Sequence, residues 1–380
     1  MKYLKHFCFG LLFTLLTVSI FPKEQIEIKK APNNTNTSVT PIKSKKTIIA
    51  KQTITAQKPL NVLLFTALPA SGKSEVRKYL DSVNKETALK EFGIAKTIQF
   101  DDFPYVHMMR LISNELISKG LEGAFFRSPV LPFKDAYEWG TLVQLINLEY
   151  EDVALQRSVS DDDSAADWIF DRIDSARARI NQPPVFSKLA PSVRHSLAAV
   201  LEKEAAKIVK NLNQNVVLGL TNKTVVIEFS RGGASSSAMP LPAPYGYNYA
   251  LSQLSPEILE KASIFYIQVA VEDSLKKNTV RSNPNDPGSI LNHKVPLAVM
   301  YADYGCDDMF YLKNKSSKPH TVSIQSHGKT YLLPIGIFDN RDDKTTFVRE
   351  EKNLWKKESV ATLHTALQKT FSELRSSQKK

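Results

Sequence analysis

The sequence predicts an α/β fold in which helices cover both faces of a mainly parallel sheet. Residues 61–66 form an almost continuous apolar run, as expected for a strand that is buried on both faces. Apolar runs of strand length then alternate with segments of helical composition, and strands resume after a long helical stretch. This alternation is typical of a three-layer arrangement with one central sheet.

The remaining elements follow from local patterns. A helix is expected from about 73 to 90, and a short strand at 97–100. The stretch from about 136 to 213 has no strand pattern and is rich in Leu, Ala, Glu and Arg. We therefore interpret about 125–215 as a helical insertion in one domain (60–380), since strands return after it. The later elements expected are a strand at 224–229, a helix at 251–261, a strand at 264–271, a helix at 272–281, hairpin strands at 321–325 and 330–337, and a helix at 350–374.

Charge is unevenly distributed along the 380 residues. The net charge is +11, but ten Lys and two Glu place +8 of it in residues 1–60, which leaves +3 for the other 320. The basic balance therefore gives little reason to expect a nucleic-acid partner for the folded part. Cys8 and Cys306 are the only cysteines, which excludes a disulfide framework, and no histidine has metal-ligand spacing.

The N-terminus has the proportions of a targeting signal. Lys2, Lys5 and His6 precede an apolar run at 7–21, which is short for a bilayer span. We interpret 1–22 as a signal peptide, which predicts a periplasmic or secreted protein. The alternative is an N-terminal anchor, with membrane contact through this segment alone. Residues 23–59 are polar and rich in Lys, which predicts a solvated linker.

A phosphate-binding loop is predicted directly after the first strand. The pattern for such a loop is Gly, four residues, then Gly-Lys-Ser/Thr, and the chain matches it except that Ala67 replaces the first Gly. At Ala67 a positive φ would cost on the order of 1 kcal/mol. The alternative is a strand–turn–helix in which Gly-Lys-Ser is coincidental. The predicted nucleotide-binding residues of the loop are Ala67, Leu68, Pro69, Ala70, Ser71, Gly72, Lys73 and Ser74.

The chemistry of such a loop explains these residue types. Backbone N–H groups and the N-terminus of the following helix attract phosphate oxygens. Lys73 is expected to reach the β- and γ-phosphates and to act in catalysis, and Ser74 to offer its hydroxyl to Mg²⁺.

With this loop, the sequence resembles the P-loop small-molecule kinase superfamily, in particular its uridine kinase-like and zeta-toxin-like members. The resemblance covers about 60–110 and 223–285. It implies a P-loop NTPase-like fold, ATP and Mg²⁺ as cofactors, and transfer of a phosphoryl group to a hydroxyl of a small molecule.

Two acidic residues follow the second strand. The resemblance implies that Asp101 acts on the acceptor hydroxyl and that Asp102 assists substrate or metal. A carboxylate at the C-terminal end of a strand faces the crevice where ligands bind in open α/β sheets, and phosphoryl transfer needs a group that orients the hydroxyl. The alternative is that the pair caps the helix that starts near Pro104, which stands where the family usually has Tyr or Phe.

Glu228 lies near the end of the strand at 224–229. By resemblance it holds Mg²⁺ through water or binds substrate. The alternative is an ordinary buried strand with one satisfied Glu, and Phe229 stands where the family often has Gly. Arg231, in the following Gly/Ser-rich loop, is a candidate for binding a phosphate or a substrate carboxylate, or else a solvated loop residue.

Lys277 and Arg281 are four residues apart and share one face of the helix expected at 272–281. The resemblance places basic residues at this point, where a cation neutralises charge on the transferred phosphoryl group. We predict that Lys277 binds the nucleotide and that Arg281 is catalytic. The alternative is a solvated basic face.

These residues predict a Mg-ATP-dependent kinase acting on a hydroxyl of a small metabolite, with a nucleoside or a sugar as candidates and the helical insertion as the place of acceptor recognition. The second hypothesis is a noncatalytic nucleotide-binding module derived from such a kinase. Export would place a kinase where ATP is scarce, which suggests action inside another cell after export, or an anchored protein whose domain faces the cytoplasm.

Overall fold

The computed structural model describes residues 59–280 and 294–378, which belong to one compact unit. The predicted leader (1–22) and nearly all of the predicted linker (23–59) lie outside the described residues. No helix within the described ranges combines the length and the apolar composition that a membrane span requires.

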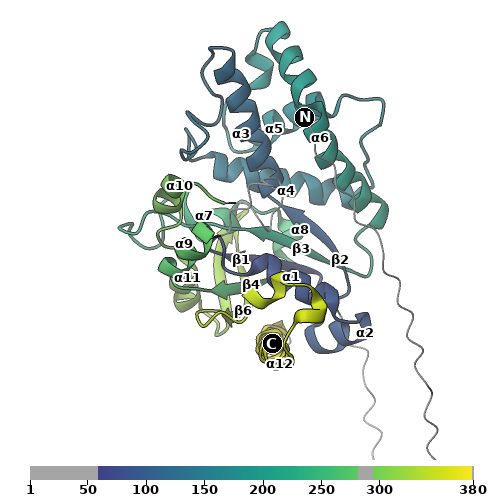
Figure 1. The fold of residues 1–380 in the computed structure, drawn as a ribbon, viewed down its shortest axis with the longest axis vertical. Helices are drawn as coiled ribbons and strands as arrows, with labels where there is room; N and C mark the ends of the chain where they lie inside the picture. Colours follow the sequence, from purple (N-terminus) through teal and green to yellow (C-terminus); the bar gives the residue numbers. More distant parts are fainter. Residues whose placement is uncertain (1–58, 281–293, 379–380) are drawn as a thin grey trace, which may run out of the picture. The chain divides into compact units, whose positions relative to one another are not determined.

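A six-stranded, mainly parallel sheet forms the centre of the fold (Figure 1), which confirms the predicted α/β class. The strand order is β2-β3-β1-β4-β6-β5, and β5 alone among these runs antiparallel to its neighbour, as the second arm of a hairpin. The strands are β1 (Val62–Ala67), β2 (Lys96–Asp101), β3 (Lys223–Phe229), β4 (Ala262–Gln268), β5 (Thr321–Ser326) and β6 (Lys329–Asp339).

The topology reverses at β1. The strands β2 and β3, which follow β1 in sequence, lie on one side of it. The later strands β4, β6 and β5 lie on the other side. In open α/β sheets, ligands bind in the crevice outside the C-terminal ends of the strands at such a reversal. The loop after β1 therefore occupies the position where this fold class places a ligand.

Side chains on the two faces of the sheet enter two separate cores. Leu63 and Phe65 of β1 pack with α1 (Lys73–Ser82) and α12 (Lys357–Gln378) on one face. Val62 and Leu64 enter the larger core on the other face. Every residue of β1 is buried, as the apolar run predicts.

Four helices connect β2 to β3 and pack against one another (Figure 1). They begin earlier than the predicted insertion of about 125–215, because α3 starts directly after Asp102 and packs against α6. The four are α3 (Phe103–Ser118), α4 (Glu138–Ala154), α5 (Ala165–Arg179) and α6 (Pro191–Leu218).

Two expected helices are divided in the structure. The helix predicted at 73–90 ends at Ser82, and Asn84 starts a new turn by accepting a hydrogen bond from Thr87 N over 2.8 Å. The helix predicted at 251–261 is divided before Pro256, which opens its own short helix. The resulting elements are α2 (Lys85–Thr87), the π-turn η1 (Ala88–Phe92), α7 (Gly246–Ser252) and α8 (Pro256–Leu259).

The rest of the chain follows the prediction in part. α9 (Val271–Val280) lies where a helix was expected, and α12 starts seven residues after the predicted start at 350. α10 (Leu297–Asp303) and α11 (Met309–Lys315) were not predicted. Short 3-10 turns complete the fold: η2 (Phe186–Lys188), η3 (Thr346–Arg349) and η4 (Lys352–Leu354).

Candidate functional site

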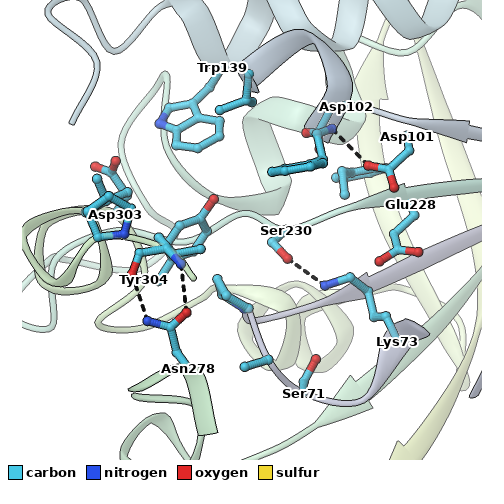
Figure 2. A pocket seen from close by; sticks show the side chains of 18 of the residues that line it. Ser71, Lys73, Asp101, Asp102, Trp139, Glu228, Ser230, Asn278, Asp303 and Tyr304 are labelled. Atoms are coloured by element: carbon cyan, nitrogen blue, oxygen red, sulfur yellow. Dashed lines mark hydrogen bonds between the residues drawn. The ribbon is translucent and has the colours of Figure 1, made fainter. Parts of the chain in front are cut away.

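A cavity of about 130 Å³ opens at the C-terminal edge of the sheet (Figure 2). Loops after β1, β2 and β3 line one side of it, and α9 and α10 contribute to the other. Eight of the predicted site residues line this cavity: Pro69, Ala70, Ser71, Lys73, Ser74, Asp101, Asp102 and Glu228.

Ala67 causes no backbone strain. It is the last residue of β1, in extended conformation, and the positive φ values lie further along the loop. Ala70 has φ 55° and Gly72 has φ 106°. The cost considered for Ala67 therefore does not arise there, and Ala70 is the loop residue with a side chain in the left-handed region.

The loop presents backbone donors at the start of α1. Within the described residues, the N–H groups of Ala70 and Gly72 donate to no protein acceptor. The first helical bond on this side runs from Val76 N to Gly72 O, 2.9 Å. Buried backbone N–H groups nearly always have a partner, so open ones at a helix N-terminus indicate a place for an anion.

Contacts from distant segments hold the loop. Asn340, directly after β6, donates to Ser71 O over 2.8 Å and to Thr345 Oγ1 over 2.9 Å. Ser274 of α9 donates to Pro69 O over 2.7 Å. These bonds fix the loop backbone without using its open N–H groups.

Lys73 lies at the centre of the site. Its ammonium donates to Ser230 Oγ over 2.7 Å and to Leu68 O over 3.5 Å, as Figure 2 shows for Ser230. The side chain is buried, so water screens its charge less and the ammonium interacts more strongly with a ligand in the cavity. Ser74, the next residue, also lines the cavity.

Asp101 and Glu228 are register partners at the ends of β2 and β3. Arg77 of α1 lies between them, with Nη1 2.6 Å from Glu228 Oε2 and 3.9 Å from Asp101 Oδ2. Burial, together with the Glu228 and Asp102 carboxylates, raises the pKa of Asp101, and Arg77 acts against that rise. Burial lowers the pKa of Arg77, but Glu228 and Asp101 outweigh it and raise that pKa overall.

The two oxygens of Asp101 have different surroundings. Oδ1 accepts from the N–H of Phe103, the first residue of α3, over 2.9 Å. Oδ2 has no hydrogen-bond donor among the described residues. The N-cap residue of α3 is Asp102, whose side chain makes no capping bond. Asp101 Oδ2 is a buried oxygen without a hydrogen-bond donor, 3.9 Å from Arg77 Nη1.

Asp102 is bound by Arg231. Nη1 of Arg231 donates to Asp102 Oδ2 over 2.6 Å and to Ser230 O over 2.7 Å, while Nη2 lies 3.4 Å from Trp139 O. Burial raises the pKa of Asp102, against the effect of Arg231. Arg231 is 2% exposed and does not line the cavity, so here it positions Asp102 and is not a solvated loop residue.

Of the two predicted cations, Lys277 of α9 does not line the cavity. Lys277 donates to Asp343 Oδ1 over 2.9 Å. Arg281 lies outside the described residues. Their predicted roles at the phosphates stay predictions.

The structure brings in residues that the sequence reasoning missed. Ser230, Trp139, Asn278, Asp303 and Tyr304 all line the cavity. They come from loops and helices far from the phosphate loop in sequence, and no local motif marks them. The one available signal was the position of Ser230 immediately after a buried strand that ends at the same edge of the sheet.

The residues fit a magnesium ion only together with a nucleotide. Within the described ranges, no group of three His, Cys, Asp or Glu side chains is placed to hold a metal ion. Mg²⁺ usually keeps several waters and takes one or two protein oxygens along with substrate phosphates. Ser74 and Glu228, both at the cavity, suit that kind of binding.

Comparisons of the chain with protein-family models, with curated proteins and with solved structures found no match. The geometry of the cavity and the residues around it therefore carry the functional argument.

Proposed function

We propose that this protein is a P-loop kinase that transfers a phosphoryl group from ATP to a hydroxyl of a small metabolite. One observation carries the proposal: the Lys73 ammonium and the N-terminus of α1 open into the same cavity as the Asp101 carboxylate. An anion site next to a carboxylate with an oxygen that lacks a hydrogen-bond donor is the arrangement that phosphoryl transfer to a hydroxyl needs.

The phosphate loop would bind the nucleotide. The open N–H groups of Ala70 and Gly72 would donate to phosphate oxygens, and Lys73 would exchange its bond with Ser230 for the β- and γ-phosphates. When bound, Mg²⁺ would supply positive charge at the same phosphates. Ser74 would offer its hydroxyl to that ion, and Glu228 would act through a water.

Asp101 would orient the acceptor. Its Oδ2 would accept the proton of the acceptor hydroxyl as that oxygen attacks the γ-phosphorus. A bond forms between the acceptor oxygen and phosphorus, and the bond to the bridging oxygen of ADP breaks. Asp102, held by Arg231, would bind a second polar group of the acceptor.

The decisive test measures nucleotide binding and turnover separately on the full chain. Isothermal titration with Mg-ATP should show binding, and Lys73→Ala should weaken it by about 100-fold or more, since a buried charge-assisted contact is lost. Lys85→Ala removes an exposed lysine of α2 and should leave binding unchanged. Unchanged affinity in Lys73→Ala would overturn the proposal.

Turnover tests the catalytic part. ADP release in the presence of metabolite pools should fall about 100-fold or more in Asp101→Asn, while ATP affinity is retained. The amide keeps the acceptor oxygen for Phe103 N but cannot take a proton. ATP binding without transfer to any pool would instead indicate the noncatalytic nucleotide-binding module.

A further inference from the structure

A second carboxylate faces the cavity from the side away from Asp101. Asp303 ends α10 and is 3% exposed, and its Oδ2 has no donor among the described residues. Figure 2 shows it beside Tyr304, across the cavity from Asp101 and Asp102. A buried carboxylate oxygen without a partner costs free energy in the empty protein, which a ligand that donates a hydrogen bond would recover.

Arg110 supplies the opposite charge at this end of the cavity. Its Nη1 donates to Pro129 O over 2.8 Å, and its guanidinium carbon lies 3.9 Å from the centre of the Phe126 ring. Burial raises the pKa of Asp303 to about 7, and the nearby charge of Arg110 acts against that rise. These contacts hold the Arg110 guanidinium in place, and Arg110 lines the same cavity as Asp303.

Aromatic rings form the wall between these charges. Trp139 meets Phe133 and Tyr304 edge-on, with ring centres 5.1 and 5.9 Å apart, and Phe133 stacks on Phe126 at 4.4 Å. All four rings line the cavity. They offer an apolar surface beside one hydrogen-bond acceptor and one donor, which is how small-molecule sites fix orientation.

We propose that Asp303, Arg110 and Trp139 form the acceptor subsite, and that it selects an uncharged ring with adjacent hydroxyl groups, as in a sugar or a cyclic polyol. This proposal deepens the proposed function, and the assignment of the subsite to the phosphoryl acceptor rests on that function.

The donor and acceptor inventory leads to this class. A carboxylate accepts and a guanidinium donates, whereas a hydroxyl does both, so neighbouring hydroxyls satisfy Asp303 and Arg110 together. The C–H face of the same ring would cover Trp139. An organic cation is disfavoured because Arg110 lies beside Asp303, and an anion is disfavoured by Asp303 itself. A wholly apolar ligand would leave the carboxylate unpaired.

The experiment measures acceptor binding to the full chain without nucleotide, by isothermal titration. The probes are D-glucose, D-galactose, D-ribose and myo-inositol, with choline and glycerol 3-phosphate as charged comparators. At least one uncharged ring should bind more tightly than either comparator. Asp303→Asn and Arg110→Met should each weaken that binding about ten-fold or more. Glu257→Gln, at an exposed site on α8, should not change it.

A second measurement needs no variant. Analogues of the tightest-binding ring that lack one of two adjacent hydroxyls should bind about ten-fold or more weakly to the wild-type chain. The proposal is overturned if no ring binds, if choline or glycerol 3-phosphate binds better, if deoxy analogues bind equally, or if a folded Asp303→Asn binds like wild type.

These outcomes separate the subsite from the kinase activity. Asp303→Asn should keep wild-type affinity for Mg-ATP, because Asp303 and Lys73 lie on opposite sides of the cavity (Figure 2). Ring binding that survives in a chain without phosphotransfer would sustain the subsite and remove the kinase activity. Phosphotransfer to a charged acceptor alone would sustain the kinase activity and remove the subsite.

Discussion

Asn340 Nδ2 donates to the Ser71 carbonyl oxygen over 2.8 Å and joins residues that are 269 positions apart. The bond ties the phosphate loop after β1 to the segment after β6. Its donor also reaches Thr345 Oγ1, and its own oxygen accepts from Lys344 N over 2.7 Å. Asn340 is buried, so this contact holds the loop from a segment outside it, as the bond from Ser274 to Pro69 O also does.

Replacing this amide should displace the loop. Asn340→Asp keeps the size and the acceptor for Lys344 N but cannot donate to Ser71. We expect the free energy of unfolding to fall by about 1–3 kcal/mol, because a buried carbonyl loses its partner. Mg-ATP affinity should fall as well. Asn222→Asp at an exposed turn is the control, and equal ATP affinity in both variants would contradict the anchoring role.

Gly72 should tolerate no side chain. A Cβ there would lie 2.5 Å from Thr345 Oγ1 and 2.9 Å from Asn340 Nδ2, and φ is 106°. Gly72→Ala should therefore lower Mg-ATP affinity about ten-fold or more, since the anchor and the loop cannot both keep their places.

Gly120→Ala separates the two causes. Gly120 also has positive φ, 75°, but a Cβ there would meet nothing within 4 Å. It should show the cost of the backbone conformation alone, about 1 kcal/mol in stability, with unchanged ATP affinity. If thermal unfolding and titration gave the same result for both variants, close packing against Thr345 would not be the cause.

The phosphate loop and its flanking elements were predictable because their signals are local. An apolar run predicted β1, and the Gly-Lys-Ser that follows the loop after β1 predicted the start of α1. The conformation within the loop was less accessible. The sequence directed attention to Ala67, whereas the left-handed residue with a side chain is Ala70.

The far side of the cavity could not be predicted, because nothing local marks it. Asp303 belongs to a short helix whose pattern is no clearer than that of a loop, and Asn340 follows a strand as many turn residues do. Their importance arises from tertiary contacts alone. For Arg231 the local signal was present but pointed to another role. Its type and position suggested a ligand contact, whereas its buried bond to Asp102 assigns it a positioning role.

Arg77 should couple energetically to Glu228. Arg77→Met leaves the buried carboxylates of Glu228 and Asp101 without their shared cation, and we expect a loss of about 3–5 kcal/mol in the free energy of unfolding. The double variant Arg77→Met/Glu228→Gln should lose less than the sum of the single variants. Arg194→Met, which breaks a more exposed pair with Asp167, should cost about 1 kcal/mol or less. Additive losses in urea unfolding would contradict the coupling.

Glu149 should make stability depend on pH. Burial raises the pKa of Glu149 to about 7, with Arg172 and the Tyr105 hydroxyl acting against that rise. The ordinary value is 4.5, so the folded protein keeps a proton that the unfolded chain releases. Stability should therefore fall as pH rises from about 4.5 to 7. Glu149→Gln keeps an acceptor for Tyr105, whose hydroxyl donates over 2.7 Å, and should remove this slope.

Glu151 provides a control of opposite sign on the same helix. Its hydrogen bonds with Arg179 lower the pKa of Glu151, so its contribution is present above the ordinary pKa and is lost as pH falls. In urea unfolding at pH 5 and pH 8, Glu149→Gln should gain about 1–3 kcal/mol relative to wild type on going to pH 8. Glu151→Gln should instead keep a nearly constant difference from wild type between pH 5 and pH 8, and this difference should shrink only below the ordinary pKa of 4.5. Parallel pH profiles for wild type and Glu149→Gln would show that the buried carboxyl ionises as readily in the folded state as in the unfolded chain.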